Sequence, residues 1–173
     1  MELRRAGKSG LSLSRLGLGT MTWGRDTDTH EAAEQMRCYI EAGGNFIDTA
    51  STYADGDAER VIGGLIGTFF EREEVVIATK AGISFPDGQR TVHNSRHHLI
   101  AELDRSLTRL GTDYVDLWQV HTWDENVPLE DTLSALDYAY SSKANSNKDE
   151  FDPAGITKNP GFAFDFGADY QVN

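Results

Sequence analysis

The chain has 173 residues, of which 39% are hydrophobic, and this length and composition suit one globular domain with its own core. Its 28 acidic and 16 basic residues leave a formal charge of -12, which argues against nucleic acid and membrane surfaces as partners, because both are bound mainly through basic patches. The charged N-terminus has no apolar signal-peptide run behind it, and no segment approaches the roughly 18 apolar residues of a membrane helix, so a cytoplasmic protein is expected.

Apolar, strand-like runs alternate with helical patterns along most of the chain. A turn from Gly7 to Gly10 predicts a hairpin near the start. Four strands are then predicted over 16–20, 45–50, 75–80 and 114–121, and each is followed by a helix, over 29–41, 58–66, 95–110 and 128–140. Because helical crossovers join parallel strands, the series predicts four βα units of an α/β fold.

Two architectures fit this pattern. The strand cores are continuously apolar, as in Val75 to Ala78, which is typical of strands covered on both faces. A doubly wound sheet and a β/α barrel both have such strands. The usual dinucleotide fingerprint is absent, because the third glycine after Gly17 and Gly19 would fall on Thr22.

The composition changes beyond residue 141. The stretch up to Pro160 is polar, without apolar periodicity, and is interrupted by Pro153. Aromatic residues then stand at even spacing, at Phe162, Phe164, Phe166 and Tyr170, which is a period-two strand pattern. We therefore expect one unit over 1–141, and a polar linker with a strand-like tail of uncertain origin over 142–173 that does not continue the βα alternation.

Three predicted strands end in a residue that is costly to bury, namely Asp48, Lys80 and His121. The carboxyl ends of parallel strands are where active sites are built, because the βα loops meet there. A lysine at the end of an apolar strand needs a carboxylate, and Asp48 on the preceding strand is the nearest candidate by topology. Tyr53 follows in the loop beyond Asp48 and is expected to lean over the same strand ends.

Together these four residues suggest proton transfer at a carbonyl group. A tyrosine has a pKa of about 10, and a neighbouring ammonium such as that of Lys80 stabilises its phenolate form. Asp48 would hold Lys80 in place, while His121 would donate a hydrogen bond to a substrate oxygen or take part in proton transfer. Hydride would have to come from a nicotinamide cofactor, because no side chain supplies it.

Several segments resemble the aldo/keto reductase family, and they occur in the family's order. They are SRLGLGTMTWG, EAGGNFIDTASTYADGDAERVIGGLI, VVIATKAG, SLTRLGTDYVDLWQVH and PLEDTLSALDYA. The resemblance covers about residues 1–141. It implies a partial (β/α)8 TIM barrel, with about four βα units preceded by an N-terminal hairpin, and reduction of aldehydes or ketones to alcohols with NADP, or less often NAD, as cofactor.

The resemblance also implies roles for individual residues. The family's catalytic tetrad falls on Asp48, Lys80, His121 and Tyr53, the last as proton donor. The segment of Gly19, Thr20 and Met21, together with Asp48, would lie near the nicotinamide and its ribose.

Structural alternatives accompany each of these roles. Asp48 with Lys80 would be a buried ion pair between two strands. Trp23 and Trp123, which follow the first and fourth strands, would line a substrate pocket or pack in the core or at its rim. The histidines His30, His93, His97 and His98 lie before or within first helical turns with polar neighbours, so no metal site is predicted. Cys38 has no cysteine partner and is expected to be a small core residue.

A complete barrel has eight βα units in about 250 residues, and this sequence supplies about four. The family's Ser-Asn pair for the nicotinamide amide and its later phosphate-binding basic residues have no counterpart here. We therefore expect a truncated reductase of weak or no activity on a small-molecule carbonyl substrate. A non-enzymatic relic or a cofactor-binding regulatory module is the alternative. A metal-dependent barrel isomerase or hydrolase would need a ligand cluster that is not found. Open edges on the first and fourth strands would favour self-association.

Overall fold

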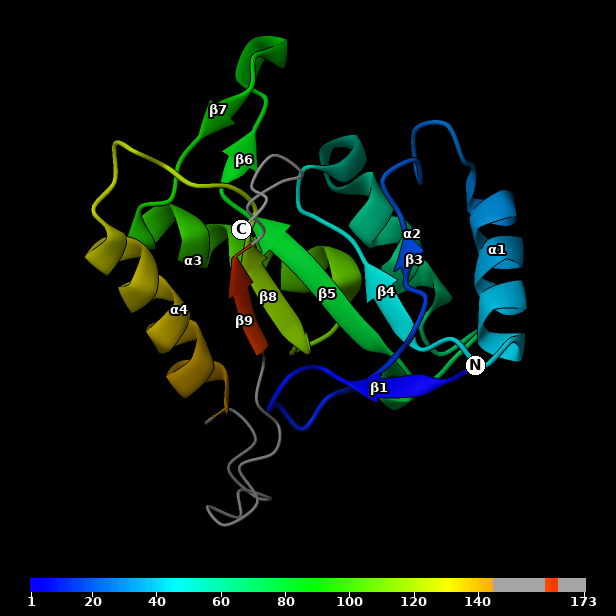
Figure 1. Cartoon of the computed structure of the whole chain (residues 1–173). Helices are drawn as coiled ribbons and strands as arrows, with labels where there is room; N and C mark the ends of the chain where they lie inside the picture. The colour runs from blue at the N-terminus through cyan, green and yellow to red at the C-terminus, as the bar shows by residue number, and fades with distance from the viewer. Residues whose placement is uncertain (145–160, 165–173) are drawn as a thin grey trace, which may run out of the picture.

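A parallel β-sheet forms the centre of the protein in the computed structural model, which describes residues 1–144 and 161–164 (Figure 1). Its strands lie in the order β3-β4-β5-β8-β9. Their bounds are Leu18–Gly19 for β3, Phe46–Asp48 for β4, Val76–Ala81 for β5, Leu117–Val120 for β8 and Gly161–Phe164 for β9. The helices are α1 at Thr29–Glu41, α2 at Asp57–Leu65, α3 at Arg96–Leu110 and α4 at Leu129–Ala144. The four predicted βα units are confirmed, and they form part of a β/α barrel.

Two hairpins stand at opposite ends of the sheet. Strands β1 (Leu3–Arg5) and β2 (Ser12–Ser14) pair antiparallel around the predicted turn and cross the amino-terminal ends of the central strands (Figure 1). Strands β6 (Ile83–Ser84) and β7 (Thr91–Val92) project from the carboxyl-terminal side. Short 3-10 turns cover Tyr53–Gly56, Arg72–Glu74 and Pro86–Gly88. No helix in these described segments is both long and apolar enough to cross a membrane.

The two faces of the sheet differ because side chains alternate along each strand. On β4 and β8, Ile47, Trp118 and Val120 are buried against the helices. Their neighbours in sequence, including Phe46 and Gln119, are only half-buried on the opposite face. The helix-facing residues form two apolar clusters, one around α1 and α2 and the other around α3 and α4. Each large side chain buried there contributes about 1.5–3 kcal/mol to folding.

A buried carboxylate joins the helices to the strand that carries Lys80. Glu59 of α2 is fully buried and accepts a 2.6 Å hydrogen bond from Thr79 Oγ1 of β5. Its other oxygen accepts a 2.6 Å bond from Arg109 Nε of α3. Because the charge of Glu59 is compensated by Arg109, the carboxylate can remain in the interior and fix β5 against both helices.

A second carboxylate fixes the amino-terminal end of the sheet. Asp116 precedes β8, and its Oδ2 accepts a 2.9 Å hydrogen bond from the backbone N–H of Ile77 and a 2.7 Å bond from Arg72. The guanidinium of Arg72 also lies 3.9 Å from the centre of the Tyr114 ring. This cluster sets the pairing of β5 with β8 at the end remote from Lys80.

The tail differs from the sequence expectation. Residues 161–164 are strand-like as predicted, but the prediction that the tail does not continue the βα alternation is wrong. They form β9, which pairs in parallel with β8 from Leu117↔Gly161 to Val120↔Phe164. The edge of β8 is therefore covered, and the expectation of an open edge there is also wrong. Period-two spacing indicates a strand without indicating its partner. Residues 145–160 and 165–173, with Phe166 and Tyr170, lie outside the described residues.

Cys38 is exposed on α1, so its prediction as a core residue is wrong. The buried positions of that helix are Ala32, Ala33 and Met36, which share one face at helical spacing. Cys38 lies off that face, and its small apolar character alone did not indicate this.

Two adjacent glycines on α2 give a direct test of the packing between α2 and α3. A Cβ at Gly63 would lie 2.7 Å from the carbonyl oxygen of Arg109, whereas a Cβ at Gly64 would meet no atom within 4 Å. Gly63→Ala should lower the free energy of unfolding by about 1–3 kcal/mol, because the helices must separate. Gly64→Ala should raise it by up to about 1 kcal/mol through helix propensity. Urea denaturation of both variants checks this, and equal effects would contradict the close approach.

Candidate active site

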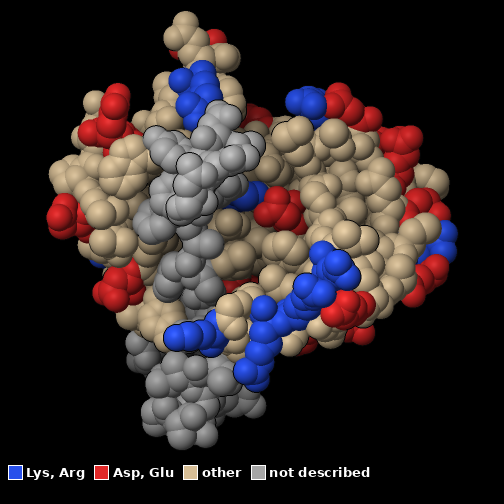
Figure 2. All heavy atoms as spheres, in the orientation of Figure 1, with Lys and Arg blue, Asp and Glu red and all other residues tan. Residues whose placement is uncertain are grey.

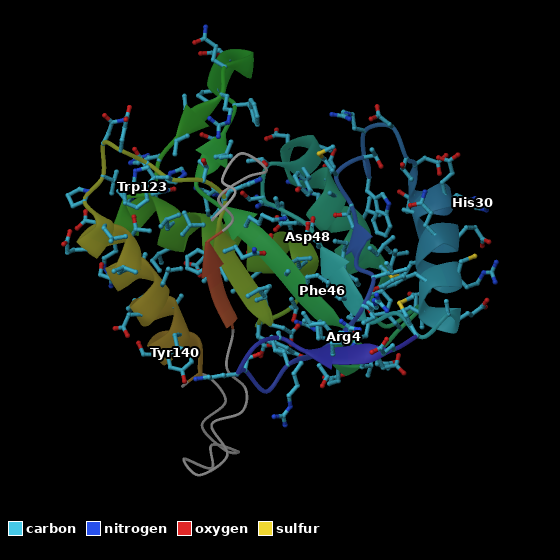
Figure 3. The ribbon with its side chains drawn as sticks, in the orientation of Figure 1. Arg4, His30, Phe46, Asp48, Trp123 and Tyr140 are labelled. Atoms are coloured by element: carbon cyan, nitrogen blue, oxygen red, sulfur yellow. The ribbon has the colours of Figure 1, made fainter. Side chains whose placement is uncertain are left out.

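The carboxyl ends of β4 and β5 bring Asp48 and Lys80 into contact. Lys80 Nζ lies 2.8 Å from each carboxylate oxygen of Asp48 and 3.0 Å from the carbonyl oxygen of Thr49. The Lys80 side chain is only 4% exposed, while that of Asp48 is 33% exposed. Figure 3 shows Asp48 at the carboxyl end of β4, on the side of the sheet away from the helices. The predicted ion pair is therefore present and reaches the surface through its carboxylate.

Tyr53 lies next to the buried ammonium. Its hydroxyl oxygen is 3.5 Å from Lys80 Nζ, and its ring centre is 5.2 Å from the same atom. A positive charge at this place stabilises the negative charge that develops when the hydroxyl gives up its proton.

A left-handed turn follows Tyr53. Ala54 and Asp55 have φ values of 49° and 54°. Such values are uncommon for residues with a side chain, and the alanine costs about 1–2 kcal/mol there. The turn directs the chain from the strand end back into α2 and leaves Tyr53 over the strand ends. Sequence reasoning missed this turn because neither residue is a glycine or an asparagine.

His121 lies on the other side of β5, directly after β8. Its backbone N–H donates a 2.8 Å hydrogen bond to the carbonyl of Ala81. Its ring stands edge-on to the ring of Tyr53, with 6.0 Å between the ring centres and 78° between the planes. The structure thus brings together all four residues that the sequence singled out, Asp48, Tyr53, Lys80 and His121.

The segment of Gly19, Thr20 and Met21 runs beside Asp48. Gly19 is in register with Asp48, and a Cβ on Gly19 would meet no atom within 4 Å. Met21 is exposed. Thr20 is fully buried, and both its N–H and its hydroxyl donate to the carbonyl of Asp48, at 3.0 and 3.1 Å. The open space at Gly19 and the partly exposed Asp48 leave room for a group beside them, whereas the buried Thr20 positions the segment.

The two candidate tryptophans have different surroundings. Trp23 is 0% exposed, belongs to the core around α1, and donates a 2.9 Å hydrogen bond from Nε1 to Gln35. It offers no surface to a substrate, so the prediction that it lines a pocket is wrong and the packing alternative holds. Trp123 is 51% exposed on the loop from β8 to α4 (Figure 3).

Of the other histidines, His30 lies on α1, while His93, His97 and His98 lie before or within the first turn of α3. His93 and His98 stack with 4.5 Å between ring centres. Burial, and then the neighbouring His93, lower the pKa of His98 below its ordinary value. Among the described residues, no three histidine, cysteine or carboxylate side chains form a group that could hold a metal ion.

Comparison with known proteins decides the family. The sequence model described as the Aldo/keto reductase family matches residues 15–142. The chain belongs to the aldo/keto reductase family.

The family's members include bacterial reductases that are similar to this chain. The aldo-keto reductase YhdN of Bacillus subtilis is 35% identical, over 82% of this chain and 44% of that protein. The L-glyceraldehyde 3-phosphate reductase of Escherichia coli K12 is 38% identical, over 82% of this chain and 42% of that protein. The aldo-keto reductase AKR11C1 from Bacillus halodurans, solved in its holo form, superposes with a TM-score of 0.75 at 34% identity, over 83% of this chain and 47% of that one. This chain thus spans less than half the length of these relatives.

The lowered pKa of His98 predicts a pH dependence of stability. The unfolded chain takes up a proton on His98 as pH falls through about 6.5, whereas the folded chain resists it, so the free energy of unfolding should decrease. In the His98→Asn variant, the free energy of unfolding should therefore fall less between about pH 7.5 and 5.5 than in the unaltered chain. Urea denaturation at both pH values checks this. His30→Asn, which removes an exposed histidine from α1, is the matched control. An unchanged slope in His98→Asn would contradict the assignment.

Proposed function

We propose that this chain carries the acid–base residues of an NADP-dependent aldo/keto reductase, which reduces aldehydes or ketones to alcohols. One observation supports this above the others: Lys80 Nζ contacts both oxygens of Asp48 at 2.8 Å and the hydroxyl of Tyr53 at 3.5 Å. A buried ammonium beside a phenol suits proton donation to a carbonyl oxygen. The reductases among the relatives support the same class of reaction.

The proposed mechanism divides the work among four side chains. Tyr53 donates the proton to the substrate oxygen, and Lys80 stabilises the phenolate that remains. Asp48 holds Lys80 in position, and His121 directs the substrate oxygen toward Tyr53 through a hydrogen bond. The hydride for the carbonyl carbon would come from a nicotinamide cofactor, when one is bound. Gly19, Met21 and Asp48 are the proposed contacts to the cofactor, and Trp123 to the substrate.

We also propose that the chain alone is weakly active. A (β/α)8 barrel closes around eight strands, so that its loops surround the site on all sides. The described residues supply five parallel strands in one open sheet. Figure 2 shows the open face as a hollow lined mainly by uncharged residues, with blue and red side chains near its upper end. Among the residues that the structure describes, the cofactor would therefore be held from one side only.

A regulatory module that binds the cofactor without turnover is the second candidate. The observation in its favour is the similarity to a probable voltage-gated potassium channel subunit beta of Arabidopsis thaliana, which is 37% identical over 80% of this chain and 42% of that protein.

The Tyr53→Phe variant tests the reductase proposal. With an aldehyde in excess, NADPH oxidation by the unaltered chain should be measurable, and Tyr53→Phe should reduce it by about 100-fold or more, because the proton donor is lost. NADPH fluorescence should report the same binding in both proteins. Tyr114→Phe, at the amino-terminal end of the sheet, is the matched control and should retain activity.

The outcomes separate the candidates. Binding of NADPH without any oxidation would favour the regulatory module. Oxidation that persists in Tyr53→Phe would overturn the role of Tyr53, and absence of binding would contradict both proposals. NADH titrated in parallel decides which cofactor is preferred.

We further propose that the chain self-associates through the edge of β3. Among the described residues, β3 pairs only with β4, and Leu16 beside this edge is 66% exposed. An open edge next to an apolar side chain favours pairing with a second strand. Sedimentation velocity should show a mass that grows with concentration, and Leu16→Lys should suppress the growth. Phe85→Lys, at the exposed tip of the β6–β7 hairpin, is the control. A monomer at all concentrations would exclude the proposal.

A further inference from the structure

A buried polar cluster holds the segment that follows β8, and the proposed reaction does not use it. It consists of Asn94, Asp124 and Thr132, and we call it the Asn94 cluster. Their exposed fractions are 2%, 5% and 4%. The three residues come from the segment before α3, from the loop after β8 and from α4, respectively. Polar side chains that are buried to this degree cost folding free energy unless they are hydrogen-bonded.

Hydrogen bonds run from Asn94 to both sides of Trp123. The backbone N–H of Asn94 donates to Asp124 Oδ2 at 3.0 Å, and its side-chain Nδ2 donates to the carbonyl of Thr122 at 2.7 Å. The hydroxyl of Thr132 donates to the carbonyl of Asn94 at 3.1 Å. The second carboxylate oxygen of Asp124 accepts the N–H of Asn126 at 3.0 Å.

The same cluster is attached to the end of β5. The N–H of His93 donates to the carbonyl of Gly82 at 2.9 Å, two residues beyond Lys80. Gly82 has a φ of 107°, and a Cβ at Gly82 would collide with Oδ1 of Asn94, so the contact requires glycine. The strand that carries Lys80 therefore also places Asn94.

These bonds bracket His121 along the chain. Its own N–H is bonded to Ala81, and the carbonyl of the next residue, Thr122, is bonded to Asn94. These hydrogen bonds fix the backbone around His121, so only the side-chain torsions can move its ring. The ring stands edge-on to that of Tyr53. Hydrogen bonds to a buried carboxylate are about twice as strong as neutral ones, so Asp124 supplies a firm anchor.

We propose that Asn94 and Asp124 are positioning residues, which hold His121 at the place where it directs a substrate oxygen toward Tyr53. The catalytic purpose of this positioning rests on the proposed reductase function. The position of the His121 ring can be measured whether or not the chain is active. The alternative is a purely structural role, in which the cluster only ties α3 and α4 to the sheet.

The substitution Asp124→Asn separates the two roles. Asp124 accepts two backbone N–H groups, one on each oxygen, whereas an asparagine offers one acceptor oxygen and turns an NH₂ group toward the other donor. Asp116→Asn is the matched control, because Asp116 also accepts a backbone N–H group but lies at the opposite end of β8. Both variants should lower the melting temperature.

The readout is the NMR signal of the His121 ring. The chain has five histidines, and the signal is assigned as the one missing from His121→Gln. In Asp124→Asn it should shift and broaden, whereas in Asp116→Asn it should stay in place. Equal destabilisation by both variants with an unmoved His121 signal would overturn the proposal. If Asp124→Asn does not fold, Thr132→Val takes its place, because it removes one hydrogen bond to Asn94. The His121 signal should then shift in Thr132→Val, and an unmoved signal would overturn the proposal.

A turnover measurement keeps this proposal apart from the proposed function. Where the unaltered chain oxidises NADPH with an aldehyde, Asp124→Asn should lower kcat by about tenfold or more with little change in KM, because His121 is displaced rather than removed. Asp116→Asn should change neither. A chain without turnover contradicts the reductase function, while the position of the His121 signal still decides whether the cluster holds that residue.

Discussion

The buried ammonium of Lys80 is the constraint on which the rest of this structure depends. Burying an ammonium that is only 4% exposed costs folding free energy unless a partner compensates its charge. Asp48 meets this need with both oxygens, and the carbonyl of Thr49 supplies a third acceptor. The pairing requires β4 and β5 to be adjacent and parallel, with Asp48 opposite Ala78. The order of the strands and the position of the charge pair are thus two aspects of one requirement.

The sheet separates stability from chemistry by its two faces. The helix-facing side chains are mostly apolar, with Thr79 and the compensated Glu59 among the polar exceptions, and they supply most of the burial. The opposite face carries Asp48 and half-buried residues such as Phe46 and Gln119. Because neighbouring residues on one strand serve different faces, Thr79 can bind Glu59 while Lys80 binds Asp48. The network behind the sheet therefore supports the site directly.

Much of this arrangement could be predicted from the sequence. The apolar runs indicated the strands because their helix-facing residues are buried or partly buried. Polar residues at the strand ends indicated the site because parallel strands converge there. The family followed from motifs that span the same region. Three features could not be predicted from the sequence, for physical reasons. Trp23 follows a strand end, yet a large apolar ring is drawn into the nearest core. Ala54 adopts a left-handed conformation that an alanine rarely adopts. The partner of β9 depends on which edge is available in space.

The pairing of β9 with β8 has a consequence for which substitutions this strand can accept. Strand pairing relies on main-chain groups, which every residue except proline offers alike. A segment of four residues that completes the ladder beside β8 is therefore specified mainly by its extended form and its reach. Several residue types could therefore keep the same ladder, whereas Asp48 and Lys80 are required by their charges. The outer strand is thus defined by its backbone, and the centre of the sheet by its side chains.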